Sequence, residues 1–263
     1  MKKKVKFCAL SAVAVTALLC LFRYTSSYFV DTETAVNVIK IGKISVELTE
    51  NFTPPENALP GRIFEKAPKL INNGTKDEFV FLKITVPKEK VTLLYETNTV
   101  VNEETKKAGT IRKAKDTFEI FRMMADNSDE HPVMKLQNPF QTDALDFDTD
   151  FSYHLAPANK EGWIFLQANS TDANSDSYVF GYSKKLSPEK ETVTLFDKVQ
   201  LKSFINGEVS GKKTISVQPY AIQAEGLTAD GLSDNYNPDE TISLNDLKVI
   251  YQVIQNRGEA AEN

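Results

Sequence analysis

Cysteine is nearly missing from this 263-residue sequence, and both copies, Cys8 and Cys20, lie in an N-terminal apolar segment. Beyond residue 20 there is no thiol for a disulfide, a metal site or a nucleophile. This excludes a small disulfide-stapled scaffold and suits a bacterial surface or secreted protein that relies on its core alone. Tryptophan occurs once, at Trp163, whereas 16 phenylalanines and 9 tyrosines indicate an aromatic core.

Histidine is almost as scarce. The two copies, His131 and His154, fall in irregular sequence, where we expect both at the surface. No G-x-S-x-G element occurs, and neither histidine starts an H-E-x-x-H pair, since Pro132 follows the first and Ala158 stands four residues after the second. Nucleophile-and-base catalysis and a zinc-protease centre therefore lack support. We expect no catalytic residue, no cofactor and no metal, and hence a protein that is not an enzyme.

Acidic residues gather in two loops without forming a known metal-binding pattern. Asp143–Asp150 and Asp230–Asp239 have suitable spacing, but neither has the Gly and Glu positions of a calcium loop. We interpret both as solvated acidic loops. No pattern singles out a carboxylate pair for glycoside hydrolysis.

Residues 1–27 predict a signal peptide. Four lysines lie within the first six residues, Phe7–Phe22 carries no charge, and Thr25–Ser27 supplies small residues for a signal peptidase. We expect cleavage between Ser27 and Tyr28. The alternative is an uncleaved membrane anchor, although 16 uncharged residues fall short of the roughly 20 that span a bilayer.

Cleavage would make the chain strongly acidic. Residues 1–27 contain five basic residues and no acidic one, so their removal moves the formal net charge from −5 to −10. This argues against nucleic acid or an anionic membrane as a partner. The predicted localisation is secreted, in an extracellular matrix or at the cell surface.

The stretch Tyr28–Glu50 joins the signal peptide to the body of the protein. Ile44, Val46 and Leu48 alternate with polar residues, which predicts a half-buried strand. Gly42 marks a point where a bulge or a change of sheet costs little. The apolar positions before Gly42 form a candidate donor strand, able to pair outside its own domain: Tyr28, Phe29, Val36, Val38, Ile39 and Ile41.

Residues 28–226 predict many short strands between Asn, Asp, Gly and Pro clusters. Glu78–Val86 is the most strand-like run. Its apolar residues on both faces indicate a strand covered on both sides, and we expect Pro87 to end it. Between Lys88 and Lys160 the pattern predicts long loops with short strands, including a charged surface excursion at Asn102–Lys115.

The later part of the body is more regular. Gly162–Leu166 and Ser177–Ser183 predict a hairpin, and Thr192–Leu201 a further strand. Lys213–Ala224 predicts a last strand, and Pro219 within it favours either an edge strand or a bulge.

The C-terminal extension, residues 227–263, predicts one short amphipathic helix at about 243–256. Ser243 is a suitable N-cap and Gly258 a suitable stop. An apolar stripe would pack on the sheets, formed by Leu244, Leu247, Tyr251 and Ile254. The predicted fold class is therefore all-β: a jelly-roll-like β-sandwich with long loops and a short C-terminal helix.

The junction after the signal peptide resembles the TasA/camelysin family of secreted proteins from Gram-positive bacteria. The resemblance rests on Tyr28-Phe29-Val30-Asp31-Thr32-Glu33 and on Ile41-Gly42-Lys43-Ile44, and it covers roughly residues 1–227. Val30 and Tyr24–Ser27 depart from the family pattern. Further matches follow in order at Pro60-Gly61, Pro68, Asn72-Asn73-Gly74, Phe79–Lys83, Val86-Pro87, Phe118–Phe121, Trp163, Tyr178–Tyr182, Leu195–Val199 and Tyr220–Ala224.

This resemblance implies a jelly-roll-like sandwich and a structural role in a biofilm matrix. It also implies maturation by a SipW-type signal peptidase. The expected partners are other copies of the chain, joined head to tail into fibres, with other matrix or host-surface components as further partners. After cleavage, the donor strand would complete the sheet of the next subunit. The alternative is that this strand pairs only within its own domain.

Two other functions stay open at this point. Camelysin-type members imply a surface metalloprotease, although the sequence lacks a zinc motif. The third hypothesis is an adhesin or ligand-binding sandwich that uses the long acidic loops.

Overall fold

The structure is a computed structural model that describes residues 44–50, 59–136, 140, 151–155 and 161–262. All of these belong to one unit, Asn37–Asn263. The predicted signal peptide and the whole candidate donor strand lie outside the described residues.

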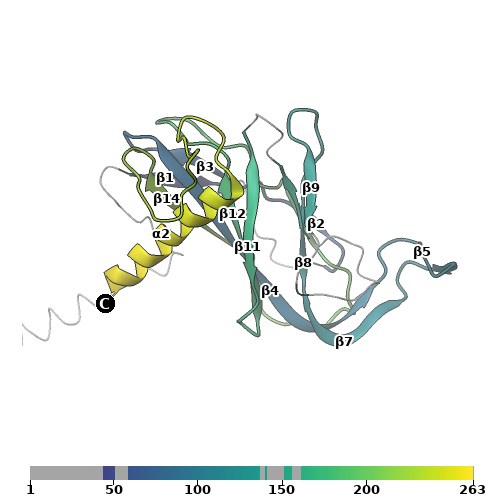
Figure 1. Ribbon diagram of the computed structural model, residues 1–263. Coiled ribbons are helices and arrows are strands. Elements are labelled where there is room, and N and C mark those ends of the chain that lie inside the picture. Colours follow the sequence, from purple (N-terminus) through teal and green to yellow (C-terminus); the bar gives the residue numbers. More distant parts are fainter. Residues whose placement is uncertain (1–43, 51–58, 137–139, 141–150, 156–160, 263) are drawn as a thin grey trace, which may run out of the picture. The chain divides into compact units, whose positions relative to one another are not determined.

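One sheet is built around β4 (Glu78–Leu94) (Figure 1). Its strand order is β11 (Trp163–Asn169), β12 (Ser175–Tyr182), β4 and β14 (Ser216–Gln223), and β7 (Ile111–Glu119) pairs with the second half of β4. Every pairing in this β4 sheet is antiparallel. The predicted hairpin is confirmed as β11 and β12, and the predicted last strand as β14, at the end of the strand order.

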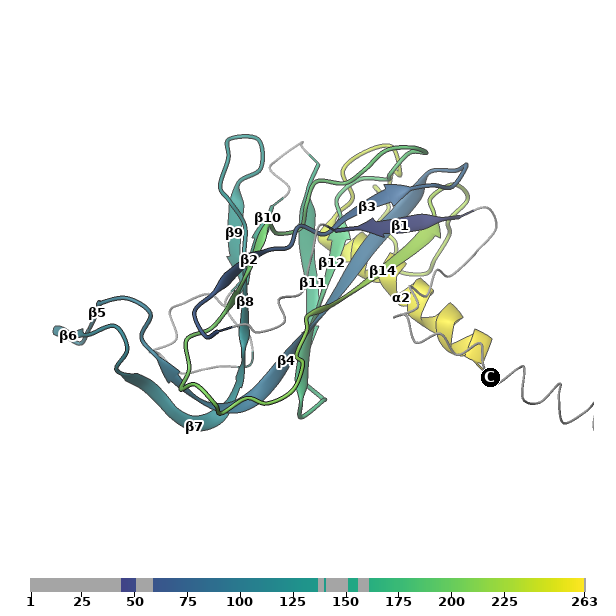
Figure 2. The same cartoon turned by 180° about the vertical axis from the view of Figure 1, so that it is seen from behind.

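The second sheet, called the β8 sheet below, consists of short strands (Figure 2). Its order is β2 (Ile63–Glu65), β13 (Lys198–Leu201), β8 (Phe121–Met124), β10 (Phe151–His154) and β9 (Val133–Leu136). The pairing of β10 with β8 is parallel and reduced to one residue pair, Phe151 with Met123. The predicted strand Thr192–Leu201 is thus shorter than expected, because only its last four residues form β13.

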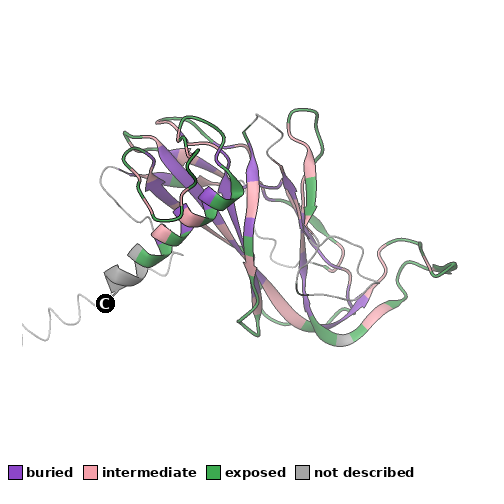
Figure 3. Ribbon diagram, in the orientation of Figure 1, coloured by how far each residue is buried: buried purple, intermediate pink, exposed green. Residues whose placement is uncertain are grey.

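The two sheets pack face to face around an aromatic core. Phe151 and Tyr153 of the β8 sheet each lie 5.0 Å, between ring centroids, from Phe180 of the β4 sheet. Along β4, the even-numbered residues Val80 to Val86 join this core. Figure 3 shows the buried residues following the inner strands of both sheets.

The other face of the β4 sheet is covered by α2 (Leu244–Glu262). Phe81 on this face lies 5.4 Å from Tyr251 of the helix, between ring centroids. A second core forms here, and it also contains Phe79, Leu166, Val179, Ile222, Leu247, Ile250 and Ile254. β4 is therefore covered on both sides, as predicted from its apolar residues.

α2 begins where the sequence predicts and ends later. Ser243 Oγ accepts a hydrogen bond from Asp246 N (3.1 Å), as an N-cap does. The helix continues through Gly258 to Glu262 instead of ending near residue 256. Gly258 costs helix stability only weakly, so it does not by itself stop a helix.

The prediction that Pro87 ends its strand is wrong, because β4 runs through it to Leu94. Pro87 lies where β14 has ended and β7 begins to pair along the same side of β4. Pro87 O accepts a hydrogen bond from Ile120 N (3.2 Å), and Ile120 O accepts one from Lys202 N (2.9 Å). The carbonyl of Ile120, which receives no hydrogen bond from Pro87 because proline lacks an N–H, is thus satisfied by the N–H of Lys202.

Two small ribbons complete the fold. β1 (Val46–Thr49) pairs antiparallel with β3 (Lys69–Asn72). β5 (Thr99–Val101) and β6 (Glu104–Lys106) form an exposed hairpin, whose turn and second strand lie in the predicted charged excursion. Asn102 and Glu103 at its tip both have positive φ, as a two-residue type I′ turn requires.

The predicted fold class is confirmed: the chain is an all-β sandwich with a short C-terminal helix. It is jelly-roll-like in that the chain crosses repeatedly between the two sheets. β7 is followed by β8 in the other sheet, β10 by β11, and β13 by β14.

Candidate functional site

The predicted assembly segment is only partly within the described residues. The cleavage residues Ser27 and Tyr28 lie outside them, as does the rest of the donor strand, which comprises Phe29, Val36, Val38, Ile39 and Ile41. The described chain begins at Ile44, and β1 pairs with β3 from Val46 opposite Asn72 to Thr49 opposite Lys69. The second half of the stretch Tyr28–Glu50 therefore pairs within its own domain, and the donor hypothesis applies only to the residues before it.

A buried carboxyl group fixes the point where this segment joins the domain. Glu78, the first residue of β4, is fully buried, and its Oε1 accepts a hydrogen bond from Ser45 N (3.0 Å). Burial raises the pKa of the Glu78 carboxyl, against the smaller effect of the Ser45 N–H. On the other side, Ser45 O accepts from Asn73 N (2.7 Å).

A donated strand needs an open sheet edge, and the edge strand β14 is protected. Ala224 N donates to Asp77 O, so the even-numbered residues of β14 form the hydrogen-bonded pairs with β4. Pro219 is odd-numbered, and its nitrogen faces away from β4. A further strand added along β14 would meet a residue without an N–H, which is a common protection of an edge.

The edge strand β2 lacks such a proline and is not covered by another strand within the part of the chain that the structure describes. Lys66 N donates to Asp197 O and Leu201 N to Arg62 O, so even-numbered residues of β2 bond to β13. The main-chain groups of Ile63 and Glu65 therefore face away from the β8 sheet. The Ile63 side chain is 50% exposed, and Leu59 just before the strand is exposed too. Among the described residues, none pairs with the main-chain groups of Ile63 and Glu65, which lie beside apolar side chains.

The prediction that both histidines are surface residues is wrong for His154. This residue is 5% exposed, at the end of β10, and His131 is half-buried with its ring centroid 6.0 Å from that of His154. His154 Nε2 lies 2.8 Å from Asp197 Oδ2, and His154 Nδ1 lies 3.3 Å from His131 O. Sequence reasoning missed this cluster because Asp197 and His154 are 43 residues apart.

Asp197 is the centre of the cluster. Its carboxylate also accepts hydrogen bonds from Asp126 N (2.7 Å) and from Thr194 Oγ1 (2.9 Å). Burial alone would raise the pKa of this carboxyl group, but the bonds from His154, Asp126 and Thr194 outweigh burial and lower it to about 2. Burial likewise opposes the charged form of His154, yet Asp197 and the His131 carbonyl outweigh it and raise the pKa of the imidazole.

This geometry does not suit His154 for general-base or metal chemistry. Both of its ring nitrogens face oxygen atoms that only accept hydrogen bonds, so both contacts are hydrogen bonds when both nitrogens carry a proton, and that form has no free lone pair. The hydroxyl of Thr194 bonds to Asp197 and not to the imidazole. In its doubly protonated form His154 therefore links two segments of the chain through hydrogen bonds.

A further polar cluster lies on the inner face of the β4 sheet. Lys88 Nζ lies 2.7 Å from Asp176 Oδ1, and the Tyr178 hydroxyl donates to Glu119 Oε1 over 2.5 Å. Lys88 and Glu119 are cross-strand partners on β4 and β7. These bonds join β4, β7 and β12 through polar side chains inside the sandwich.

The acidic loops are only partly described. The whole of Asp143–Asp150 lies outside the described residues. In the second loop, Asp239 forms an ion pair with Lys185 over 2.5 Å. Within the described part of the chain, no group of three or more His, Cys, Asp or Glu side chains is placed to hold a metal ion.

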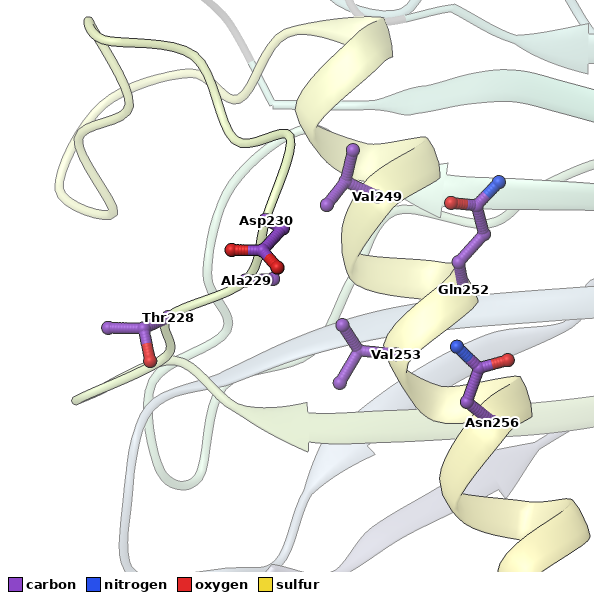
Figure 4. A pocket seen from close by; sticks show the side chains of 7 residues that line it. All are labelled: Thr228, Ala229, Asp230, Val249, Gln252, Val253 and Asn256. Carbon is purple, nitrogen blue, oxygen red and sulfur yellow. The ribbon is translucent and has the colours of Figure 1, made fainter.

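A shallow pocket of about 510 Å³ lies between α2 and the loop that precedes it (Figure 4). Val249, Gln252, Val253 and Asn256 line it from the helix, and Thr228–Asp230 from the loop. Asp230 is the one charged residue among the described side chains that line it.

None of the described helices is long and apolar enough to cross a membrane. Comparison with known proteins adds no assignment: no protein-family model matches the chain, and no curated protein or solved structure is detectably similar to it.

Proposed function

We propose that this protein is a secreted, non-catalytic structural protein of an extracellular matrix or cell surface. In this proposal a SipW-type signal peptidase cleaves it after Ser27. The segment that begins at Tyr28 then becomes a donor strand, and copies of the chain join head to tail into fibres of a biofilm matrix. The partners are other copies of the chain, with further matrix or host-surface components but no nucleic acid.

The observation that carries this proposal is the open edge of β2. Ile63 and Glu65 offer main-chain groups to a partner strand, and each such hydrogen bond contributes about 0.5–1.5 kcal/mol. The exposed side chains of Leu59 and Ile63 would pack against the apolar side chains of the added strand. A donor strand of alternating apolar residues such as Val36 and Val38 has the pattern that an edge accepts.

The pairing of β1 supports the same proposal. Because β1 is bonded to β3 in its own domain, it anchors the chain firmly right after the candidate donor strand. A donor strand links two subunits firmly only if it is attached to a stably folded part of its own subunit.

Deletion of residues 28–41 tests the proposal. The shortened protein is expected to remain a folded monomer, since β1 and the two cores are kept, and to form no fibres. Fibres that persist after the deletion would contradict donation by this segment.

Single substitutions in the donor strand give a matched pair. Val38→Lys places a charge on its apolar face, and Asn37→Lys places the same charge on the opposite face. Strand donation predicts that V38K slows fibre growth, as followed by light scattering, much more than N37K. Equal effects of the two variants would contradict it.

A further inference from the structure

We propose that His154 is a pH-sensitive latch, which in its doubly protonated form holds the β9–β10 hairpin to the rest of the β8 sheet. This inference is independent of the proposed function. It rests on the position of His154 in the sheet and on the partners of its two ring nitrogens.

The hairpin is joined to its neighbour by little backbone pairing. β10 pairs with β9 over four residues but with β8 through the single pair Phe151–Met123. Beyond that pair, β10 contacts the segment before β13 in place of β8, and His154 N donates a hydrogen bond to Leu195 O (3.0 Å). The bond from His154 Nε2 to Asp197 therefore lies where a regular ladder would have continued.

The imidazole also joins the end of β10 to the segment just before β9. His154 Nδ1 donates to the carbonyl of His131, two residues before β9, while Leu155 N donates to Pro132 O (2.9 Å). One imidazole thus links β10 to the segment leading into β9 and to the segment leading into β13. Both links require a proton on the ring nitrogen, because a carboxylate and a carbonyl only accept hydrogen bonds.

Loss of one proton from the His154 imidazole breaks one of the two hydrogen bonds and replaces it by a repulsion between the ring nitrogen and the facing oxygen atom. A neutral imidazole keeps a single N–H, so a nitrogen lone pair would face either the Asp197 carboxylate or the His131 carbonyl. Inside the protein this repulsion is weakly screened. The hairpin is then attached mainly by its buried aromatic side chains.

The charged groups around His154 favour the doubly protonated form. Asp197 bonds to the ring directly, and Asp126, which follows β8, adds a second negative charge nearby. Lys198 is the opposing charge from β13, but it is paired with Asp126 (2.8 Å). From the end of β2, Lys66 donates its main-chain N–H to Asp197 O and directs its ammonium group to Glu50 (2.6 Å). Among the described residues, the half-buried ring of His131 is a further titratable neighbour.

The direction of the pH effect follows from these contacts. The pKa of His154 is raised in the folded protein, so its contribution is fully present below the pKa of an unfolded histidine and is lost as the pH rises through the folded value. Asp197, whose pKa is lowered to about 2, keeps its charge throughout that range. The latch therefore opens on the alkaline side.

Nuclear magnetic resonance on the full-length chain tests the latch. The imidazole nitrogens of His154 are followed between pH 5 and 9, together with amide exchange corrected for its intrinsic pH dependence. We expect His154 to titrate above free histidine, and protection of the β10 amides to fall through that titration while protection of β12 stays constant. Titration at or below free histidine, or constant protection of β10, would overturn the proposal.

Three variants separate the latch from a general loss of structure. Asp197→Asn is expected to lower the titration midpoint of His154, and His154→Gln to remove the pH dependence of β10 protection. His131→Gln is the matched control, because it removes the other imidazole but keeps the carbonyl that His154 uses. A pH dependence that survives H154Q and disappears in H131Q would assign the effect to His131 and overturn the proposal.

Discussion

The two sheets of this protein are stabilised in different ways. β4 has 17 residues and β12 and β14 have 8 each, whereas the strands of the β8 sheet have three or four. The β4 sheet is buried on both faces, against the β8 sheet and against α2. The β8 sheet relies more on side-chain bonds, such as that of His154 to Asp197. We conclude that the first sheet is stabilised by apolar burial on two faces, whereas the second combines one buried apolar face with side-chain bonds between its short strands.

The largest expected loss of stability follows from a substitution in the core between the β4 sheet and α2. Phe81→Ala removes a fully buried ring that packs on Tyr251, and a loss of about 3–5 kcal/mol in the free energy of unfolding is expected. Met134→Ala in β9, where the side chain is 44% exposed, should change that free energy by less than about 0.5 kcal/mol. Urea unfolding followed by Trp163 fluorescence measures both. Equal losses would contradict the contrast between the sheets.

A smaller loss of unfolding free energy is expected at the start of α2, where the charged side chain of Asp246 helps to hold the helix that covers the β4 sheet. Asp246 accepts hydrogen bonds from Ser233 N (2.7 Å) and from Ser243 Oγ (2.7 Å), which ties the preceding loop to the start of the helix. Asp246→Ala should cost about 1–2 kcal/mol of unfolding free energy near neutral pH.

The pH dependence of Asp246 sharpens this prediction. Burial would raise the pKa of its carboxyl group, but the bonds from Ser233 and Ser243 outweigh burial and lower it. Its contribution is therefore present above the pKa of an unfolded aspartate and is lost as the pH falls through the folded value. The difference between wild type and D246A should shrink on acidification in urea titrations. A difference that stays constant down to strongly acidic pH would contradict this assignment.

The smallest expected change in stability accompanies a large change in assembly. Ile63→Lys on the open edge of β2 should alter the free energy of unfolding by less than about 0.5 kcal/mol, because the side chain is exposed. A lysine on an edge strand discourages pairing with another strand, so fibre growth should be strongly reduced. Val100→Lys is the matched control, since Val100 is 68% exposed on the β5–β6 hairpin. Growth that is slowed equally by both variants would exclude β2 as the acceptor.

The fold was predictable from the sequence where the pattern is local. Apolar residues on both faces of Glu78–Val86 predict a strand buried on both sides, and Ser243 predicts the start of α2; both are found. Pro219 predicts an edge strand for the same kind of reason, because a missing N–H is tolerated there.

Predictions failed where distant segments decide the outcome. Pro87 lies inside a strand because Lys202 supplies the donor that proline lacks, and nothing near Pro87 in the sequence reveals this. His154 is buried because Asp197 and the His131 carbonyl satisfy both ring nitrogens. The open edge of β2 depends on its pairing with β13, more than a hundred residues later in the chain.

The central claim is that cleavage before Tyr28 releases a donor strand, and electron microscopy of two purified forms tests it most directly. One form begins at Tyr28, and the other keeps residues 1–27. The account predicts regular fibres from the form that begins at Tyr28 and none from the uncleaved form. Monodisperse particles in both preparations would contradict it.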